Sequence, residues 1–429
     1  MAYCLISPVL QRTSVLLIMF TLYLPATAMA ALLPLEDIYE KLEVQPTGNM
    51  AADLAVHYKK YAKYRKPKAL ALAFTADSYS IGYSHKAPSE LGASRLALGS
   101  CEKWRVDNGV GGQCEIVLLG DELVSPGAII KRKVNETTPA MVWRVEGTGG
   151  ALYLVGTIHA LKPTLLPLPA VFDQVFAQSE IIAFEMNPIL ATDPVRIQAA
   201  QNLMAVDPKL QKSLYDKTTR KLLKGFAKNY DLRVESAYTV PAVINAMQVS
   251  QLKMAALGYT VNTGVEMYYA REASKAGKAI VELEGPTDAW TPLVNLPMET
   301  QLLMLRESIL QLETIPAQLD MLITSWLFGD AEQLYAETIK SMSLSSQLDS
   351  QTDPTLLAVA VELLDQRNKR WMEKIDGMLQ APKSSVVMAG AAHFGGENGL
   401  LALLRKQGLN PVQLTWGGED IIQSSSIGD

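Results

Sequence analysis

Two histidines share the pattern Gly-x-x-His and could form one chemical site. His159 ends the run ALYLVGTIH and His393 ends the run SVVMAGAAH, and both runs are typical of buried strands. In α/β sheets, ligands bind at the carboxyl ends of the strands, where side chains converge on a crevice. Gly156 and Gly390 allow the backbone to turn tightly there or another group to approach closely. The other two of the four histidines precede residue 86, so the repeated pattern predicts one shared site.

Two imidazoles at one crevice indicate shared coordination of a divalent metal ion. Neutral imidazole together with carboxylate suits zinc, manganese or cobalt, and an open coordination position leaves room for an activated water. We expect His159, His393 and Glu185 to hold the ion, because Glu185 directly follows the strand-like run IIAF. The alternative for the histidines is a structural role, with each imidazole hydrogen-bonded to backbone at a strand end.

Two carboxylates and one arginine are the expected catalytic groups. Glu185 and Glu284 end buried runs and can project at the same sheet edge, although an acid in that place can also mark where a strand meets solvent. Arg367, in RNKRW, could orient a carboxylate or stabilise an oxyanion, or it could lie on a solvated helix face. Glu266 is a third acidic candidate, with the simpler interpretation that it complements a helix dipole.

Other chemistries find little support in the sequence. The larger domain has no G-x-S-x-G, no HExxH and no cysteine, which argues against serine, zincin and thiol hydrolases. The net charge of -5 comes without the concentrated basic patch that phosphate backbones require, so we expect no nucleic-acid partner.

The elements that must position these residues form an α/β fold of the mixed α+β type. The order strand, Gly-x-x-His, helix, strand occurs twice, first from ALYLVGTIH to IIAFEM and again from SVVMAGAAH to PVQLTW. Two such units predict parallel strands in one core sheet. The intervening residues, from about 191 to 379, have mainly helical patterns, interrupted by the strand-like run GKAIVELEG, and we expect these helices to cover the sheet.

The first thirty residues have the features of a secretory signal peptide. Arg12 precedes a short apolar core, and the stretch from Ala28 to Ala30 offers a small-residue cleavage site. The apolar run is shorter than the roughly 20 residues that span a bilayer, and no later segment approaches that length. We therefore expect a periplasmic or secreted protein with no integral membrane segment after cleavage; the alternative is an uncleaved anchor.

About 400 residues remain, which favours two domains. A small α+β domain is expected over residues 31–124, a linker over 125–140, the larger domain over 141–420 and a tail over 421–429. Cys101 and Cys114 would close a loop of about a dozen residues, which in an oxidising compartment favours a disulfide over a redox or metal-binding thiol pair. The sequence does not identify the role of the small domain or the oligomeric state.

The order of the motifs resembles that of a known family. YLVGTIHALKPTLLPLP, SEIIAFEMNP, GVEMYYAREASKAGKAIVELEG, LFGD, QRNKRW and VVMAGAAHFGGENGLLALLRKQG follow one another as in the TraB/PrgY/GumN family, over about residues 142–416. Relatives include the Tiki proteins, regarded as metal-dependent proteases. The resemblance implies a Tiki-like core sheet and a metal-dependent hydrolase site. Its motifs carry over to His159, Glu185, Glu284, Arg367 and His393.

Three functions follow as hypotheses. The first is an exported metal-dependent hydrolase with a peptide or protein substrate. The second is a non-catalytic protein that captures a peptide in the same crevice. The third is an esterase without metal, in which a histidine acts as general base.

Overall fold

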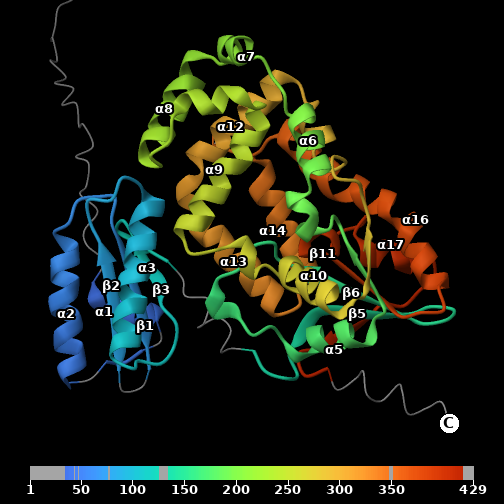
Figure 1. Ribbon diagram of the computed structural model, residues 1–429, viewed down its shortest axis with the longest axis horizontal. Coiled ribbons are helices and arrows are strands. Elements are labelled where there is room, and N and C mark those ends of the chain that lie inside the picture. Colours follow the sequence, from blue (N-terminus) through green and yellow to red (C-terminus); the bar gives the residue numbers. More distant parts are fainter. Residues whose placement is uncertain are drawn as a thin grey trace, which may run out of the picture.

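Two larger β-sheets, of four and six strands, have helices between them in the computed structural model (Figure 1), and β9 and β10 form a small two-stranded sheet. The structure describes residues 34–418 except 43, 47, 76–77, 125–133 and 347–350. The expected signal peptide, most of the expected linker and the tail lie outside the described residues. The mixed α/β fold predicted from the sequence is confirmed.

The smaller sheet has four strands in the order β2-β1-β3-β4 and carries the disulfide. Strands β1 and β2 form a hairpin, and helix α3 begins at an N-cap, where the Ser89 hydroxyl accepts from the Gly92 N–H at 3.1 Å. Cys101 on α3 is bonded to Cys114, immediately before β3, which confirms the predicted disulfide. The elements are β1 (Ala69–Phe74), β2 (Tyr79–Ser84), β3 (Glu115–Leu119), β4 (Glu122–Leu123), α1 (Leu35–Lys41), α2 (Gly48–Ala62) and α3 (Glu90–Asp107).

The larger sheet has six strands in the order β12-β5-β6-β11-β7-β8. Strand β11 lies between β6 and β7 and is parallel to both, and β7 is parallel to β8. Only β5 among these strands runs in the opposite direction, because it pairs antiparallel with both β6 and β12. The strands are β5 (Pro139–Glu146), β6 (Ala151–Thr157), β7 (Ile181–Phe184), β8 (Ala279–Glu282), β11 (Ser385–Gly390) and β12 (Val412–Thr415).

Both repeated units are present, with one difference from the expected arrangement. The first unit consists of β6, α5 and β7, and its two strands lie on opposite sides of β11, each parallel to it. In the second unit, β12 has the same direction as β11 but lies at the far edge of the sheet, because β5 and β6 intervene. The first unit contains helix α5 (Ala170–Gln178) and the second contains helix α17 (Leu400–Lys406). Two further helices contribute residues to the site described below, α10 (Val265–Ala276) and α16 (Arg367–Gln380).

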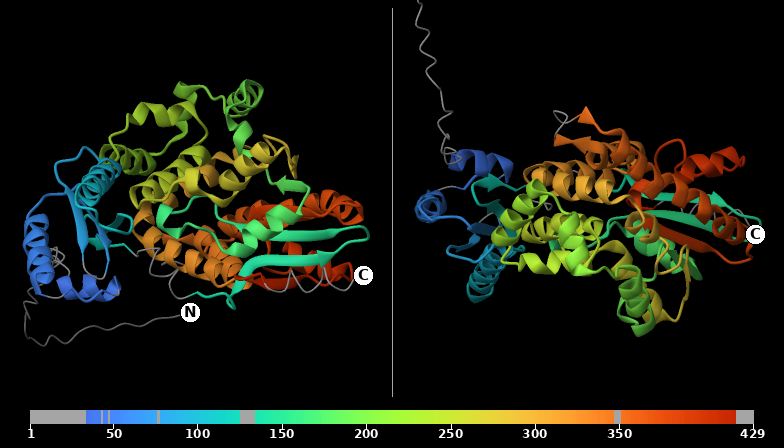
Figure 2. Two further views of the ribbon diagram at one scale, coloured as in Figure 1. Left: turned by 60° about the horizontal axis from the view of Figure 1, so that its bottom comes forward. Right: turned by 90° about the horizontal axis from the view of Figure 1, so that it is seen from above.

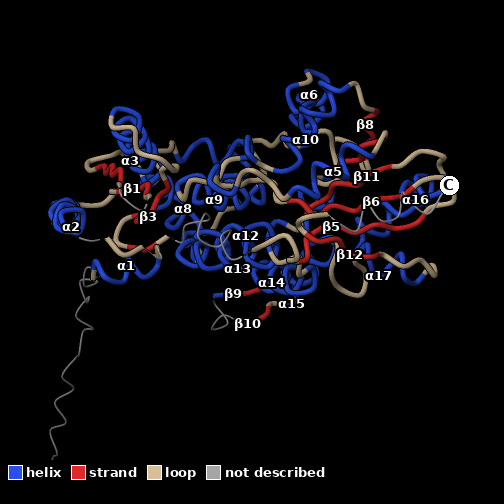
Figure 3. The backbone as a smooth tube through the Cα atoms, turned by 90° about the horizontal axis from the view of Figure 1, so that it is seen from below, coloured by secondary structure: helices blue, strands red, loops and turns tan. Residues whose placement is uncertain are grey.

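A helical layer fills the space between the two sheets (Figures 1 and 3). Helices α6, α7 and α8 form an arch at the top of Figure 1, above α9 and α12. A π-helical turn, η7 (Glu362–Gln366), joins α15 directly to α16. The layer contains α6 (Pro194–Leu203), α7 (Pro208–Leu214), α8 (Lys217–Asn229), α9 (Ala242–Ala256), α11 (Thr291–Val294), α12 (Met298–Leu310), α13 (Ile315–Leu327), α14 (Ala331–Ser343), β9 (Leu344–Ser345), β10 (Gln351–Thr352) and α15 (Pro354–Val361).

The smaller sheet is joined to this layer through α3 and α9 (Figure 2). Alanines of α3 belong to the same hydrophobic core as the end of α9. Lys253 of α9 is 1% exposed, and its ammonium group lies 3.4 Å from Glu90 and 3.8 Å from Glu122 of the smaller unit, and 3.6 Å from Glu313. A buried lysine therefore has carboxylates from both units around it. Within the described residues, no helix combines the length and the apolar character needed to cross a membrane.

Candidate metal and hydrolase site

The carboxyl ends of four neighbouring strands bring the predicted residues to one edge of the larger sheet. The register pairs Gly390 of β11 with Thr157 of β6, and Phe184 of β7 with Glu282 of β8. Because these strands are parallel, the residues that follow them emerge side by side. This register brings together all five predicted side chains, which are His159, Glu185, Glu284, Arg367 and His393.

His159 faces a glutamate from the first turn of α10. Its Nδ1 lies 2.7 Å from Glu266 Oε1, which also accepts a hydrogen bond from the Thr157 hydroxyl. Helix α10 starts here because the Val265 N–H donates to the carbonyl of the residue before His159. The adjacent Glu266 carboxylate raises the pKa of His159 to about 9, so without a metal ion the imidazole is protonated at neutral pH.

A group of three side chains has the composition and spacing of a metal site. Ligand atoms of His159, Glu185 and Glu266 lie within 4.8 Å of one another, in the part of the chain that the structure describes. The second oxygen of Glu266, Oε2, is buried and has no hydrogen-bond partner there. A buried carboxylate oxygen without a partner is costly unless a cation or proton satisfies it. The donor set of one imidazole and two carboxylates therefore fits a divalent ion.

Arg367 lies between the carboxylates of Glu185 and Glu284 and donates hydrogen bonds to both. Its Nη2 donates to Glu185 Oε2 at 2.5 Å and also to Glu284, and its Nε donates to Glu284 Oε2 at 3.0 Å. The side chain is 11% exposed, so the expected alternative of a solvated helix face is wrong. Charge-assisted pairs of this kind fix the orientation of a carboxylate. Arg367 therefore orients Glu185 and is not directed at the open cleft.

Glu185 is held at both oxygens and stays ionised. Its Oε1 accepts from the Gly390 N–H at 2.6 Å, while Oε2 accepts from Arg367. Burial alone raises the pKa of this carboxyl, but His393, Arg367 and His159 together with the backbone N–H hold the net pKa well below its usual range.

His393 is a neutral imidazole with a defined tautomer. The Asn368 amide NH2 donates to two backbone carbonyls, so its Oδ1 must accept from His393 Nδ1 at 2.7 Å. Nε2 is then the acceptor and faces Arg367 Nη1 at 3.3 Å, with Glu185 Oε1 at 3.8 Å. Burial lowers the pKa of His393 to about 3, in agreement with this tautomer.

The two histidines border the same small space above Gly390, but they differ in surroundings. A Cβ added to Gly390 would lie 3.4 Å from His159 Nε2 and 3.6 Å from His393 Cδ2. The side chain of His159 is 67% exposed and that of His393 is 4% exposed. Glu266 takes the place in the three-residue group that the sequence had given to His393.

Glu284 lies behind Arg367. Both of its oxygens accept from the guanidinium group, and Oε2 also accepts from the Trp371 indole N–H at 3.2 Å. The side chain is 5% exposed and does not line the cleft described below. Its contacts are those of a positioning residue for Arg367.

Sequence reasoning missed two residues of this arrangement, Asn368 and Trp371. The Trp371 ring lies against the His393 ring, with centroids 4.4 Å apart and the planes tilted by 41°. The spacing within RNKRW could have indicated this arrangement, because Trp371 is four residues after Arg367 and residues four apart share one helix face. An arginine and a tryptophan on one face indicate a buried face and not a solvated one.

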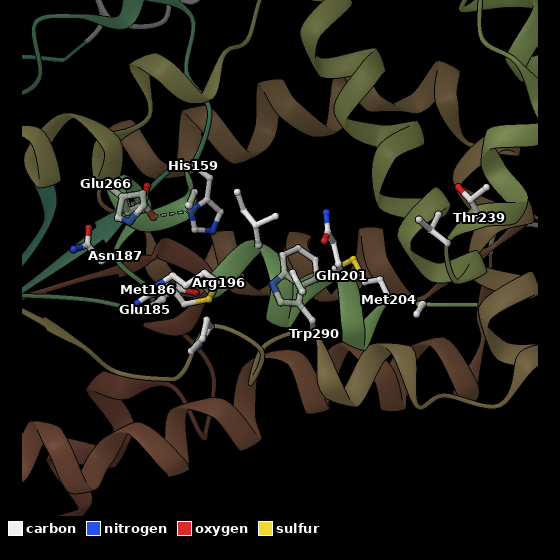
Figure 4. A pocket seen from close by; sticks show the side chains of 17 residues that line it. His159, Glu185, Met186, Asn187, Arg196, Gln201, Met204, Thr239, Glu266 and Trp290 are labelled. Carbon is white, nitrogen blue, oxygen red and sulfur yellow. Dashed lines mark ion pairs between the residues drawn. The ribbon is translucent and has the colours of Figure 1, made fainter. Parts of the chain in front are cut away.

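A cleft of about 610 Å³ opens beside the three-residue group. Figure 4 shows His159 and Glu266 at one end, Trp290 and Gln201 in the middle, and Met204 and Thr239 at the other end. The volume is in the range of small-molecule and peptide-binding sites. The candidate ligands therefore lie on the wall of a space that can hold a substrate.

Comparison with known proteins places the chain in a family. Residues 141–413 match the TraB/PrgY/gumN family. The chain belongs to this family. The match spans the larger sheet from β5 into β12, so all the residues of the site lie in the TraB/PrgY/gumN region.

Three relatives in this family have low sequence identity to the chain. It is 24% identical to the Danio rerio protein "Metalloprotease TIKI1", over 73% of this chain and 71% of that protein. It is 26% identical to "Metalloprotease TIKI2" from the same organism, over 64% of this chain and 60% of the relative. It is 23% identical to "Uncharacterized protein YbaP" of Escherichia coli K12, over 59% of this chain and 87% of that protein. No solved structure matches the chain.

Proposed function

We propose that the protein is a divalent-metal-dependent hydrolase with a peptide or protein substrate, and that His159, Glu185 and Glu266 hold the ion. The observation that carries the proposal is the buried, unpartnered Oε2 of Glu266 within a group of three potential ligands on the wall of a cleft. The two relatives named as metalloproteases support the same reaction class. A periplasmic or secreted location is part of the proposal and rests on the first thirty residues.

A divalent ion bound at this site would polarise a substrate carbonyl and lower the pKa of a water molecule. The chain prepares the site for that charge in two ways. Arg367 and the Gly390 N–H keep Glu185 ionised and oriented. Glu266 presents one oxygen to His159 and leaves the other free to accept an ion or a proton. The proton on His159 must leave when the imidazole becomes a ligand, so we expect tighter metal binding as pH rises.

His393 is a less favourable candidate ligand than His159, Glu185 and Glu266. Its Nε2 lone pair points toward the guanidinium group of Arg367, which would have to give up that contact if His393 bound the ion. We propose that His393 instead helps to position Arg367 and, through it, Glu185. Variants at His393 separate these roles, since a ligand controls metal content and a positioning residue controls turnover.

The test compares metal content and cleavage of a peptide library for chains without residues 1–30. Glu266→Gln keeps the shape of the side chain but removes its charge, and we expect loss of metal and of cleavage together. Glu272→Gln is the matched control, because Glu272 is on the same helix and pairs with exposed Lys275. His393→Gln should retain metal and lose most of its turnover.

The outcomes separate the three hypotheses. Stoichiometric metal and chelator-sensitive cleavage, both lost in Glu266→Gln, establish the hydrolase. Peptide binding without cleavage under any metal condition indicates a capturing protein. Cleavage that persists in chelator indicates the metal-independent esterase and contradicts the proposal.

A further inference from the structure

The cleft continues well beyond the candidate metal ligands into a mainly apolar region. One wall is the face of α6 that includes Ile197, Ala200 and Gln201, continued by Met204 after the end of the helix. The indole of Trp290 lies between this wall and the ligand group in Figure 4. A flexible methionine and a flat indole adapt to apolar groups of different shapes.

This region has no unpaired charge among its described lining residues. The charged residues of the ligand group lie at one end, and the remaining charged lining residue is Arg196. Both terminal nitrogens of Arg196 contact Glu282, Nη1 to Oε1 at 2.7 Å and Nη2 to Oε2 at 2.6 Å. Because Arg196 is already neutralised, a charged substrate group here would be desolvated without a counter-ion.

Helix α6 is well formed but poorly covered. Its N-terminus is capped by Asp193, which accepts from the N–H groups of Val195 and Arg196, and Pro194 takes the first helical position. No residue of α6 is buried, and Ile197 is 41% exposed on the cleft side. An apolar group in the cleft would therefore cover surface that the helix otherwise leaves in water.

We propose that this region is a specificity pocket for one large uncharged side chain, of the leucine, methionine or phenylalanine type, on the peptide whose bond lies beside His159. The inference rests on the proposed function and adds the substrate preference. A peptide suits the cleft better than an alkyl chain, because Asn187, Gln201 and Thr239 add amide and hydroxyl groups to the lining that can bind a peptide backbone.

The size of the expected preference follows from the burial of the side chain. Full burial of a leucine or phenylalanine side chain contributes about 1.5–3 kcal/mol, which corresponds to a preference over alanine of about 10-fold to 100-fold in kcat/KM. Aspartate or lysine at the same position should be cleaved no better than alanine.

The experiment uses quenched fluorescent peptides that are identical except at one position, scanned on both sides of the cleaved bond. Ala200→Phe fills the pocket and should abolish the preference for large apolar residues while leaving cleavage of the alanine peptide. Val195→Phe is the matched control, because Val195 lies on the same helix but is 77% exposed and does not line the cleft. It should cleave all peptides like the unmodified chain.

A binding measurement separates this inference from the proposed function. The same peptides are titrated calorimetrically into the unmodified chain in chelator. Binding of the leucine and phenylalanine peptides that Ala200→Phe abolishes supports the pocket, even if no metal restores cleavage and the hydrolase proposal fails. Cleavage without an apolar preference overturns the pocket and leaves the hydrolase. Absence of both binding and cleavage, or tighter binding of a fatty acid than of any peptide, also overturns it.

Discussion

Replacing Arg367 by alanine should destabilise the metal-free protein far more than an ordinary surface arginine does. Arg367 lies between Glu185 and Glu284, whose side chains are 11% and 5% exposed. Its removal leaves these two buried carboxylates without the guanidinium group that pairs with both. Breaking a buried pair in this way costs about 3–5 kcal/mol, since the remaining charge keeps its desolvation penalty.

The same helix supplies a matched control. Arg370 is 49% exposed and lies 3.3 Å from Glu362, which is 42% exposed. Exposed pairs contribute about 0–1 kcal/mol. Urea unfolding and thermal melts in chelator should therefore show a large loss of stability for Arg367→Ala, on the order of 10 °C in Tm, and almost none for Arg370→Ala.

The pH dependence gives a second readout of the same reasoning. Arg367 helps to lower the folded-state pKa of Glu185, so the carboxylate contributes stability above its unfolded pKa of about 4.3 and loses it as pH falls through the folded value. Without Arg367 that contribution disappears at neutral pH. The difference in the free energy of unfolding between the unmodified chain and Arg367→Ala should be largest near pH 7 and should become smaller as pH falls below about 4. Equal losses for Arg367→Ala and Arg370→Ala at pH 7 would refute the reasoning.

Three further predictions concern the same framework. In metal-free protein, an NMR titration should place the pKa of His159 near 9, and Glu266→Gln should return it to 6.5 or below, whereas an unchanged value would mean that Glu266 is not its cause. Replacing both disulfide cysteines by alanine should lower the free energy of unfolding by about 2–4 kcal/mol relative to the disulfide-bonded unmodified chain, measured by urea unfolding. The reduced unmodified chain should match the variant. Gly264→Ala should cost about 1–3 kcal/mol and weaken metal binding, because its Cβ would lie 2.1 Å from the His159 carbonyl oxygen. Gly225→Ala, with open space around the Cβ, should be neutral or stabilising, and equal effects of the two glycine variants would contradict the packing argument.

The sequence predicted the elements of the fold well, because strong local patterns define them. The two Gly-x-x-His strands and the disulfide follow from local residue patterns and from cysteine spacing. The position of β12 at the sheet edge did not follow, since strand order depends on contacts between distant segments and not on local pattern.

The sequence predicted the residues of the site and left several of their roles open. Glu266 was left as a third candidate with the helix dipole as its simpler interpretation, because a first-turn acid is common there and only the fold brings it to His159. Arg367 lies in a charged stretch that resembles a solvated surface. The π-helical turn η7 comes immediately before it, and such turns change which face of the following helix is buried. No sequence periodicity revealed that change.

The buried Lys253 limits how the chain can be shortened. A truncated chain that began after residue 133 would keep the whole family region but would lose Glu90 and Glu122, two of the three carboxylates around that ammonium group. It would also uncover the end of α9, against which alanines of α3 pack. Such a fragment would expose an apolar stripe beside a newly solvated lysine, and aggregation on expression is the expected result.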